Sequence, residues 1–475
     1  MKKIILSLYA IGTAGFAFAQ QGWNSHPDSV SRGAFLEDTR AEAKSRWEYR
    51  DYMRATATAI EKSQISGNKI YSINLKKFLQ QRYGNYPVDN SVRFADQPAA
   101  GFCTGFLIAP DILVTAGHCI LNEEDMKKSA WLFDYTSDLP YNSQTGQLTV
   151  DPKNIYYGVE LMATYLSQNS DDYDYCVIRL DRKTGRKPYK FRTGGKLQFE
   201  DMVTMIGSPS GIPLKVADSA HVTNNDYKTW FMTDLDAFQG NSGGPVFNQS
   251  GWIEGILVRG AKGDFEFDAT CNCIKQVVQY DFGYLLFGDK AEKGNIAHRI
   301  THIPADILKN SLYRNLQVSI DDYNMVEFKE WASYRWIFQE KLTGKENLLA
   351  YAAKTNRSSF VDTMLSIPGI DVNALDQNKS PLACVFAEYG LTSSIEKLCS
   401  NKSFDTDLKN SWGETALMIA AKNGNSRAVK ALLNAGANFA ITNNAGKTAR
   451  DLAKSNKQKE TAKILKLAAK GKPIY

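Results

Sequence analysis

Three residues that together could support nucleophilic catalysis occur in order along the chain: His118, Asp174 and Ser242. A serine hydroxyl is a poor nucleophile near neutral pH, so it needs an imidazole within hydrogen-bond reach to take its proton. A carboxylate must in turn hold that imidazole in the correct tautomer. Each of the three residues alone could be structural, but a fold that placed them in one row would make the serine an activated nucleophile.

Ser242 lies in a glycine-rich stretch, Gly240-Asn241-Ser242-Gly243-Gly244. Glycine permits backbone conformations that other residues rarely adopt, so this stretch can form a tight turn. Such a turn can aim the amides of Gly240 and Ser242 at one point. Two amides aimed in this way form an oxyanion hole, in which each donor is commonly worth about 10²–10³ in rate. We therefore predict an oxyanion hole at Gly240 and Ser242.

Apolar runs beside His118 and Asp174 predict the strands that position them. His118 follows the run Ile112–Ala116, which indicates a strand that delivers the histidine to a turn. Asp174 precedes residues 176–180, where Cys176, Ile178 and Leu180 alternate with Val177 and Arg179 in strand register. This register favours Asp174 as the carboxylate over its neighbours Asp171 and Asp172.

The rest of the first 340 residues divides into segments that differ in composition and in the pattern of apolar residues. Short β-rich runs separated by Gly, Pro, Asn and Asp extend from about residue 92 to residue 290, and they predict a sandwich or barrel rather than a parallel sheet. Residues 41–62 lack Gly and Pro and are predicted to be helical, within an N-terminal segment 20–90 that is either a pro-segment or an accessory layer. Residues 316–345 are predicted to form a helical linker.

Helical pairs recur at a nearly fixed period after residue 346. Equivalent positions are occupied by Leu349, Leu382, Leu417 and Arg450, at spacings of 33 to 35 residues. This is the period of a helix-pair solenoid. The unit that starts at Asn410 closely resembles an ankyrin repeat, and the resemblance covers about four units over residues 346–470. It implies a stack of all-α repeats whose surface binds proteins.

Three stretches carry a second resemblance: FCTGFLIAPDILVTAGHC at 102–119, DYDYCVIRL at 172–180 and DLDAFQGNSGGPVF at 234–247. Together they resemble the chymotrypsin-like serine peptidases, especially the bacterial branch that includes the glutamyl endopeptidases. The resemblance implies two six-stranded antiparallel barrels over residues 91–315. It also implies roles for the three residues: His118 as general base, Asp174 as the residue that orients it, and Ser242 as the nucleophile.

The resemblance also bears on activation and specificity. Asn241 occupies the position where trypsin-like zymogens carry an aspartate, and no Arg-Ile-Val-Gly-Gly sequence precedes His118, so activation by that ion pair is not expected. Asp236 matches the base of the specificity pocket, where a carboxylate would select Lys or Arg by charge pairing. The predicted pocket residues are Asp236, Val258 and Gly260. Arg259 could neutralise Asp236, and Leu257 stands where glutamyl endopeptidases have a histidine.

Seven cysteines are distributed over both halves of the chain. Cys103 and Cys119 flank the histidine segment and match the family's disulfide. Cys271 and Cys273 are too close in sequence to bridge comfortably, so we expect one of them to pair elsewhere. Cys176 is predicted to be a buried strand residue, whereas Cys384 and Cys399 either form a disulfide in the repeats or remain thiols. A zinc site of Cys271 and Cys273 with His298 and His302 is a weaker alternative, so no metal or other cofactor is predicted.

Residues 1–19 have the three parts of a secretory signal peptide: two lysines, an apolar run and the sequence Ala17-Phe18-Ala19. We expect cleavage after Ala19 and a secreted or periplasmic protein without a membrane span. The chain of 475 residues is 43% hydrophobic and 23% charged, with a net charge of +6, so it can build cores and has no long basic arm for nucleic acid.

The sequence therefore predicts a multidomain protein, with an all-β double barrel followed by an all-α ankyrin solenoid. Its predicted function is that of an exported serine endopeptidase, whose repeats bind a protein substrate or another protein partner. The alternative is a weak or inactive peptidase-like protein that acts mainly as an ankyrin binding module.

Overall fold

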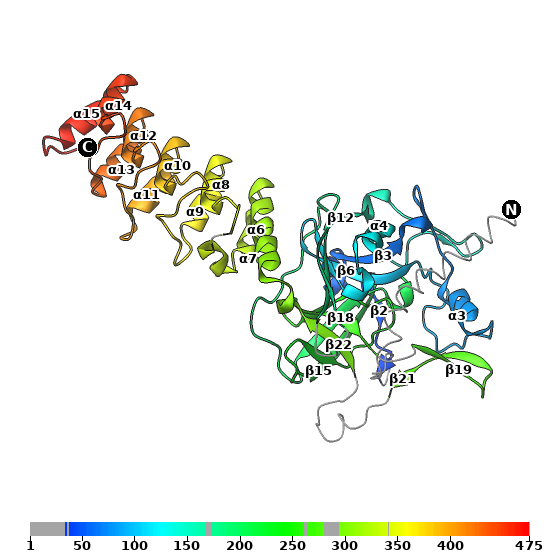
Figure 1. Cartoon of the computed structure of the whole chain (residues 1–475). Helices are drawn as coiled ribbons and strands as arrows, with labels where there is room; N and C mark the ends of the chain where they lie inside the picture. Colours follow the sequence, from blue (N-terminus) through cyan, green and yellow to red (C-terminus); the bar gives the residue numbers. More distant parts are fainter. Residues whose placement is uncertain are drawn as a thin grey trace. The chain divides into compact units, whose positions relative to one another are not determined.

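The computed structural model describes residues 34–35, 38–167, 173–260, 264–279, 294–340 and 342–474. The predicted signal peptide and the rival carboxylates Asp171 and Asp172 lie outside these residues. The chain divides into two compact units, Met1–Ser311 and Leu312–Tyr475 (Figure 1). The described elements of the first unit are mostly strands and those of the second are helices, as the change of composition along the sequence predicts.

The first sheet of the N-terminal unit has seven strands, and all its neighbouring strands are antiparallel. No pairing among the described strands joins the two ends of this sheet, so it forms a half-barrel. In sheet order its strands are β11 (Ile155–Tyr156), β8 (Ser129–Phe133), β3 (Thr56–Glu61), β6 (Gly101–Ala109), β7 (Ile112–Thr115), β13 (Asp174–Leu180) and β12 (Gly158–Leu166).

The second sheet closes on itself, because its first strand also pairs with its sixth. The closed part is a six-stranded antiparallel barrel, and a short seventh strand joins it from the N-terminal segment. The order is β14 (Met202–Gly207), β17 (Pro245–Asn248), β18 (Ile253–Arg259), β22 (Asn295–Arg299), β16 (Trp230–Thr233), β15 (Lys215–Asn224) and β2 (Ala41–Glu42). The predicted all-β architecture is thus confirmed, as one six-stranded barrel with a half-barrel rather than two equal barrels.

The prediction of a helix over residues 41–62 is wrong. The segment contains β2, two 3-10 turns, the four-residue helix α2 (Arg50–Met53) and strand β3. Residues 56–60 are completely buried, because β3 pairs with β8 on one side and β6 on the other. Pairing with residues far along the chain therefore overrides the local helix preference of this segment.

Smaller elements complete the N-terminal unit. A four-stranded sheet has the order β4 (Ile65–Ser66), β5 (Lys69–Tyr71), β10 (Gln147–Thr149) and β9 (Tyr141–Asn142). Two further pairs are the hairpin β19 (Phe265–Asp268) with β20 (Cys273–Gln276), and the parallel pair β1 (Ala34–Phe35) with β21 (Val278–Gln279). Besides α2, the described part of this unit contains the helices α3 (Leu75–Tyr83) and α4 (Glu123–Lys128).

Helices α6 (Ala305–Asp321) and α7 (Met325–Trp331) precede four helix pairs, the last of which ends at Ala468. Asn347, Thr415 and Thr448 cap the first helix of three of these pairs through their side chains. Among the described residues, no helix is both long and apolar enough to cross a bilayer. The four pairs are α8 (Leu348–Lys354) and α9 (Ser358–Met364), α10 (Leu382–Glu388) and α11 (Thr392–Cys399), α12 (Ala416–Lys422) and α13 (Ser426–Asn434), and α14 (Ala449–Ser455) and α15 (Lys459–Ala468).

Candidate active site

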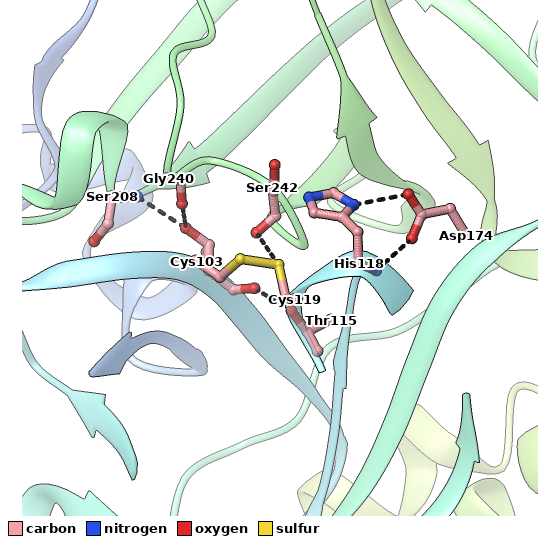
Figure 2. The surroundings of a disulfide bond; sticks show 9 residues. Cys103, Thr115, His118, Cys119, Asp174, Ser208, Gly240 and Ser242 are labelled. Carbon is pink, nitrogen blue, oxygen red and sulfur yellow. Dashed lines mark hydrogen bonds and ion pairs between the residues drawn. A yellow bond between two sulfur atoms is a disulfide. The ribbon is translucent and has the colours of Figure 1, made fainter. Parts of the chain in front are cut away.

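His118 and Asp174 meet at the ends of two paired strands. His118 lies in a 3-10 turn just after β7, and Asp174 is the first residue of β13, which pairs with β7. One carboxylate oxygen of Asp174 lies 2.8 Å from His118 Nδ1, and the other accepts the backbone N–H of His118 at 3.0 Å (Figure 2). The carboxylate thus holds both the ring and the backbone of the histidine.

Asp174 remains ionised in this position although its side chain is buried. Burial by itself raises the pKa of the carboxyl group. The charge of His118 and its two hydrogen bonds act in the opposite direction and outweigh burial, so the pKa of Asp174 lies below its ordinary value. A charged carboxylate beside Nδ1 favours the tautomer that carries its proton on this nitrogen, which leaves Nε2 as an acceptor.

The second ring nitrogen of His118 faces the side chain of Ser242 (Figure 2). Ser242 lies in the loop between β16 and β17, and its carbonyl oxygen accepts the backbone N–H of Thr104 on β6 at 2.8 Å. The next residue must be glycine, because a Cβ atom at Gly243 would lie 2.1 Å from the carbonyl oxygen of Thr104. The structure therefore brings the imidazole between the predicted carboxylate and the predicted nucleophile.

The loop before Ser242 directs its amides in an alternating pattern. Asn241 N–H donates to Phe238 O at 3.0 Å, and Gly243 N–H donates to Leu257 O at 2.7 Å. Gly240 and Ser242 directly precede these two residues in the chain, and their amides are the ones predicted to form the oxyanion hole. Gly240 has φ of 95°, in the left-handed region that favours glycine.

Comparison with known families matches both units of the chain. Residues 103–256 match the trypsin-like peptidase domain, and residues 382–472 match ankyrin repeats, with three copies. The chain carries a trypsin-like peptidase domain followed by ankyrin repeats. The matched peptidase segment includes His118, Asp174 and Ser242, whereas the first helix pair, α8 and α9, lies before the matched repeats.

Curated proteins from two bacteria are similar to parts of this chain. An "Extracellular metalloprotease" from Bacillus subtilis (strain 168) is 26% identical over 176 residues, which cover 34% of this chain and 50% of that protein. A "Probable periplasmic serine endoprotease DegP-like" from Rhizobium meliloti (strain 1021) is 30% identical over 105 residues, or 21% of each chain. The matches thus span half or less of each relative.

Cysteines in the peptidase domain form two disulfides. Cys103 and Cys119 are joined as predicted, and this disulfide lies directly below Ser242 and next to His118 (Figure 2). The expectation that Cys271 and Cys273 cannot pair with each other is wrong, because the turn between β19 and β20 brings their sulfur atoms together. Cys176 is buried in β13 as predicted, and Cys384 and Cys399 are free thiols.

Replacement of Cys103 and Cys119 together by alanine is expected to lower the free energy of unfolding by about 3 kcal/mol. The reason is that the disulfide joins residues 16 positions apart and so restricts this loop in the unfolded chain. Denaturant unfolding of the oxidised protein measures this loss. The same replacement at Cys271 and Cys273 is the control, because that disulfide closes a much shorter loop and should stabilise less. Equal losses would contradict this explanation.

The zinc alternative does not fit the described residues. Cys271 and Cys273 are bonded to each other, so neither supplies a thiolate. The described residues contain one compact group of potential metal ligands, Cys103, His118 and Cys119, and its two sulfur atoms also form a disulfide. These side chains therefore cannot form a cysteine-ligated metal site in this state.

His298 has a position that the sequence analysis missed. It lies on β22, and its Nδ1 accepts the backbone N–H of Asp174 at 2.9 Å. Its side chain is buried, and its Nε2 atom has no hydrogen-bond partner in the structure. Burial, above all, lowers the pKa of His298 to about 4. His298 is therefore neutral at pH 7 and anchors the backbone of the residue that holds His118.

This burial predicts a loss of stability in acid. The pKa of His298 is lower in the folded protein than its ordinary value of 6.5, so the unfolded chain takes up a proton first as the pH falls. The stability that depends on neutral His298 is complete above pH 6.5 and is lost towards pH 4, by about 3 kcal/mol. Asp174 opposes the shift, whereas the charges of Arg259, His302 and His118 increase it.

The variant His298→Asn tests this prediction, because an amide oxygen can accept the same backbone N–H without titrating. We expect wild type and variant to unfold at similar denaturant concentrations at pH 7. At pH 4 to 5 the wild type should lose about 2 to 3 kcal/mol more than the variant. An identical pH dependence of the two proteins would show that His298 is not the titrating group.

The predicted specificity residues are buried. Val258 is fully buried in β18 and Gly260 lies just beyond its end. Asp236 is only 3% exposed, and one of its oxygens accepts both the backbone N–H and the hydroxyl of Thr39, at 2.6 Å each. The carboxylate of Asp236 is thus engaged by the chain itself.

Proposed function

We propose that this protein is an exported serine endopeptidase that hydrolyses peptide bonds through an acyl-enzyme. The proposal depends above all on one observation, the contact of His118 Nδ1 with Asp174 while the other side of the ring faces Ser242 (Figure 2). The match to the trypsin-like peptidase domain supports it. The name of the Rhizobium meliloti relative, a serine endoprotease, agrees with this chemistry.

In the proposed reaction, the Ser242 hydroxyl oxygen attacks the carbonyl carbon of the substrate while His118 Nε2 takes the hydroxyl proton. The amides of Gly240 and Ser242 donate to the oxygen that becomes negatively charged. His118 then passes its proton to the leaving amine, and the acyl group stays on Ser242. Attack of water, with His118 again as the base, releases the acid and restores the serine.

A metal-dependent reaction, which the name of the Bacillus subtilis relative indicates for that protein, finds no support in this site. The one compact group of possible ligands in the described chain consists of a disulfide and His118. Since His118 Nδ1 is engaged by Asp174, the proposed mechanism assigns the histidine to proton transfer.

Export and partner binding are part of the same proposal. The names of both relatives place those proteins outside the cytoplasm, and the first 19 residues have the pattern of a signal peptide. The disulfides agree with an oxidising compartment. The ankyrin repeats offer an extended surface that we expect to bind a protein substrate or another protein partner.

A fluorophosphonate probe tests the proposed function, because it reacts covalently with activated serines. We expect one equivalent of probe to label Ser242 of the folded protein, with labelling blocked by a competing peptide substrate. A folded protein that the probe does not label would contradict the proposal and favour the alternative, a binding module without proteolytic activity. Mass spectrometry of the labelled protein identifies the modified residue.

A further inference from the structure

The loop that leads to Ser242 is held by the N-terminal segment Asp38–Glu42, nearly 200 residues earlier in the chain. Thr39 donates two hydrogen bonds to one oxygen of Asp236. Thr39 is exposed whereas Asp236 is 3% exposed, so Thr39 lies on the solvent side of the carboxylate. Hydrogen bonds to a buried charge are among the stronger ones in proteins, which makes this contact an effective anchor.

The next residue, Arg40, packs against the same loop. Its guanidinium carbon lies 3.5 Å from the centre of the Phe238 ring, two residues after Asp236. Arg40 is buried, and its charge is balanced by a two-pronged contact with the carboxylate of Asp38 and a hydrogen bond to Gln276. A buried guanidinium that is paired with a carboxylate in this two-pronged way fixes the geometry of its neighbours.

The end of the segment is part of the barrel. Ala41 and Glu42 pair with Val216 and Lys215 at the start of β15. Lys215 is buried, and its ammonium group lies 3.2 Å from a carboxylate oxygen of Glu42. Burial lowers the pKa of Lys215 to about 8, which shows that the buried charge of its ammonium group is costly. Loss of Glu42 would leave this ammonium group without its carboxylate. The segment is therefore fixed at both ends.

The side chain of Asn241, next to Ser242, does not hold the loop by hydrogen bonds. Its side chain is completely buried, and neither of its amide atoms has a hydrogen-bond partner in the structure. Asp264 is a further anchor, since its carboxylate accepts the backbone N–H of Gln239 at 2.6 Å. Two more hydrogen bonds reach the same stretch of backbone, from Ser210 N–H to Gln239 O and from Thr104 Oγ1 to Gly240 O. The backbone just before Gly240 is thus positioned by contacts at Asp236, Phe238 and Gln239.

We propose that Asp38–Glu42 is a positioning element of the active enzyme, and that Asp236 serves to anchor it rather than to bind a basic substrate side chain. This inference rests on the proposed function. Gly240 lies four residues after Asp236, so release of Thr39 would let the amide of Gly240 move away from the developing oxyanion. The competent protein accordingly retains the chain from Asp38 onward, and any removed pro-segment ends before this residue.

The variant Thr39→Val tests the contact with a side chain of the same shape but without the hydroxyl donor. We expect about a tenfold fall in the rate of Ser242 labelling by the fluorophosphonate and in kcat, with KM changed less than twofold. Thr39→Ser keeps the hydroxyl and should restore both rates to within twofold of wild type. A merely structural role would lower the unfolding temperature without this split between kcat and KM.

The claim that Asp236 does not bind a basic substrate side chain is tested with peptides that differ only in the residue before the cleaved bond. We expect Thr39→Val to lower kcat for peptides with Arg, Lys, Glu or Leu at that position by similar factors. A protein that starts at Asp38 should be active, whereas one that starts at Ala43 should lose at least 100-fold in labelling rate.

Other outcomes have a definite meaning. If Thr39→Val is labelled as fast as wild type, the segment does not position the loop. If this variant becomes faster and gains cleavage after Arg and Lys, the segment is a plug that hides the carboxylate of Asp236, and the proposal is wrong. If wild type itself is not labelled, the proposed peptidase function fails, which separates that failure from a failure of this inference.

Discussion

Replacement of Ser242 by alanine is expected to lower kcat for peptide hydrolysis by about 10⁶-fold. In the proposed mechanism, the change removes the atom that forms the acyl-enzyme, and His118 then has no hydroxyl proton to accept. The backbone contacts of residue 242 remain, because the N–H of Thr104 donates to its carbonyl oxygen rather than to its side chain. The folded structure and the affinity for substrate should therefore change little.

The measurement combines steady-state hydrolysis of a fluorogenic peptide with thermal unfolding of the same samples. Ser250→Ala is the matched control, since Ser250 is an exposed serine in the turn between β17 and β18. We expect this control to stay within twofold of wild type in kcat. If Ser242→Ala keeps more than a tenth of the wild-type activity while it remains folded, Ser242 is not the nucleophile.

Local patterns predict the elements around the site well. The strand Ile112–Thr115, the turn at His118 and the strand that starts at Asp174 all follow from runs of apolar residues and their alternation. The repeats are predictable for a similar reason, because each helix pair is a local unit that recurs at a fixed period. In these segments the information for structure lies within about 35 residues of chain.

Contacts between distant segments could not be predicted in this way. Strand β3 looks helical by composition, yet it is buried between β6 and β8, whose residues lie some 40 to 75 positions further along the chain. His298 accepts the N–H of Asp174 across 124 positions of sequence, and Thr39 reaches Asp236 across 197. None of these residues carries a local signal of its partner, so only the assembled barrel reveals them.

The same distinction explains the wrong expectation at Cys271 and Cys273, and the contact of Asp236 with Thr39 that the sequence did not reveal. The separation of Cys271 and Cys273 seemed too short for a disulfide, but the turn of a hairpin can bring such close residues face to face. Asp236 matches a pocket position in the family pattern, yet its environment depends on an N-terminal segment that the pattern does not include. A motif thus specifies the backbone around a residue better than the partner of its side chain.

The variant Asp174→Asn is expected to lower kcat by about 10⁴-fold. An asparagine side chain has nearly the same shape, and its amide oxygen can still accept the backbone N–H of His118. Its amide nitrogen, however, would donate to His118 Nδ1, which places the ring proton on Nε2. The nitrogen that faces Ser242 would then be a donor and could not take the hydroxyl proton.

Steady-state kinetics and the rate of fluorophosphonate labelling measure this effect together, and both should fall because both require an activated serine. Asp181→Asn is the control: Asp181 follows the far end of β13 and pairs with Arg182 near the surface. We expect this control to retain full activity. Nearly unchanged labelling of Asp174→Asn would mean that another carboxylate orients His118. Loss of labelling in the folded variant would instead support Asp174, because only the side chain that fixes the ring tautomer has this effect without disturbing the loop around Ser242.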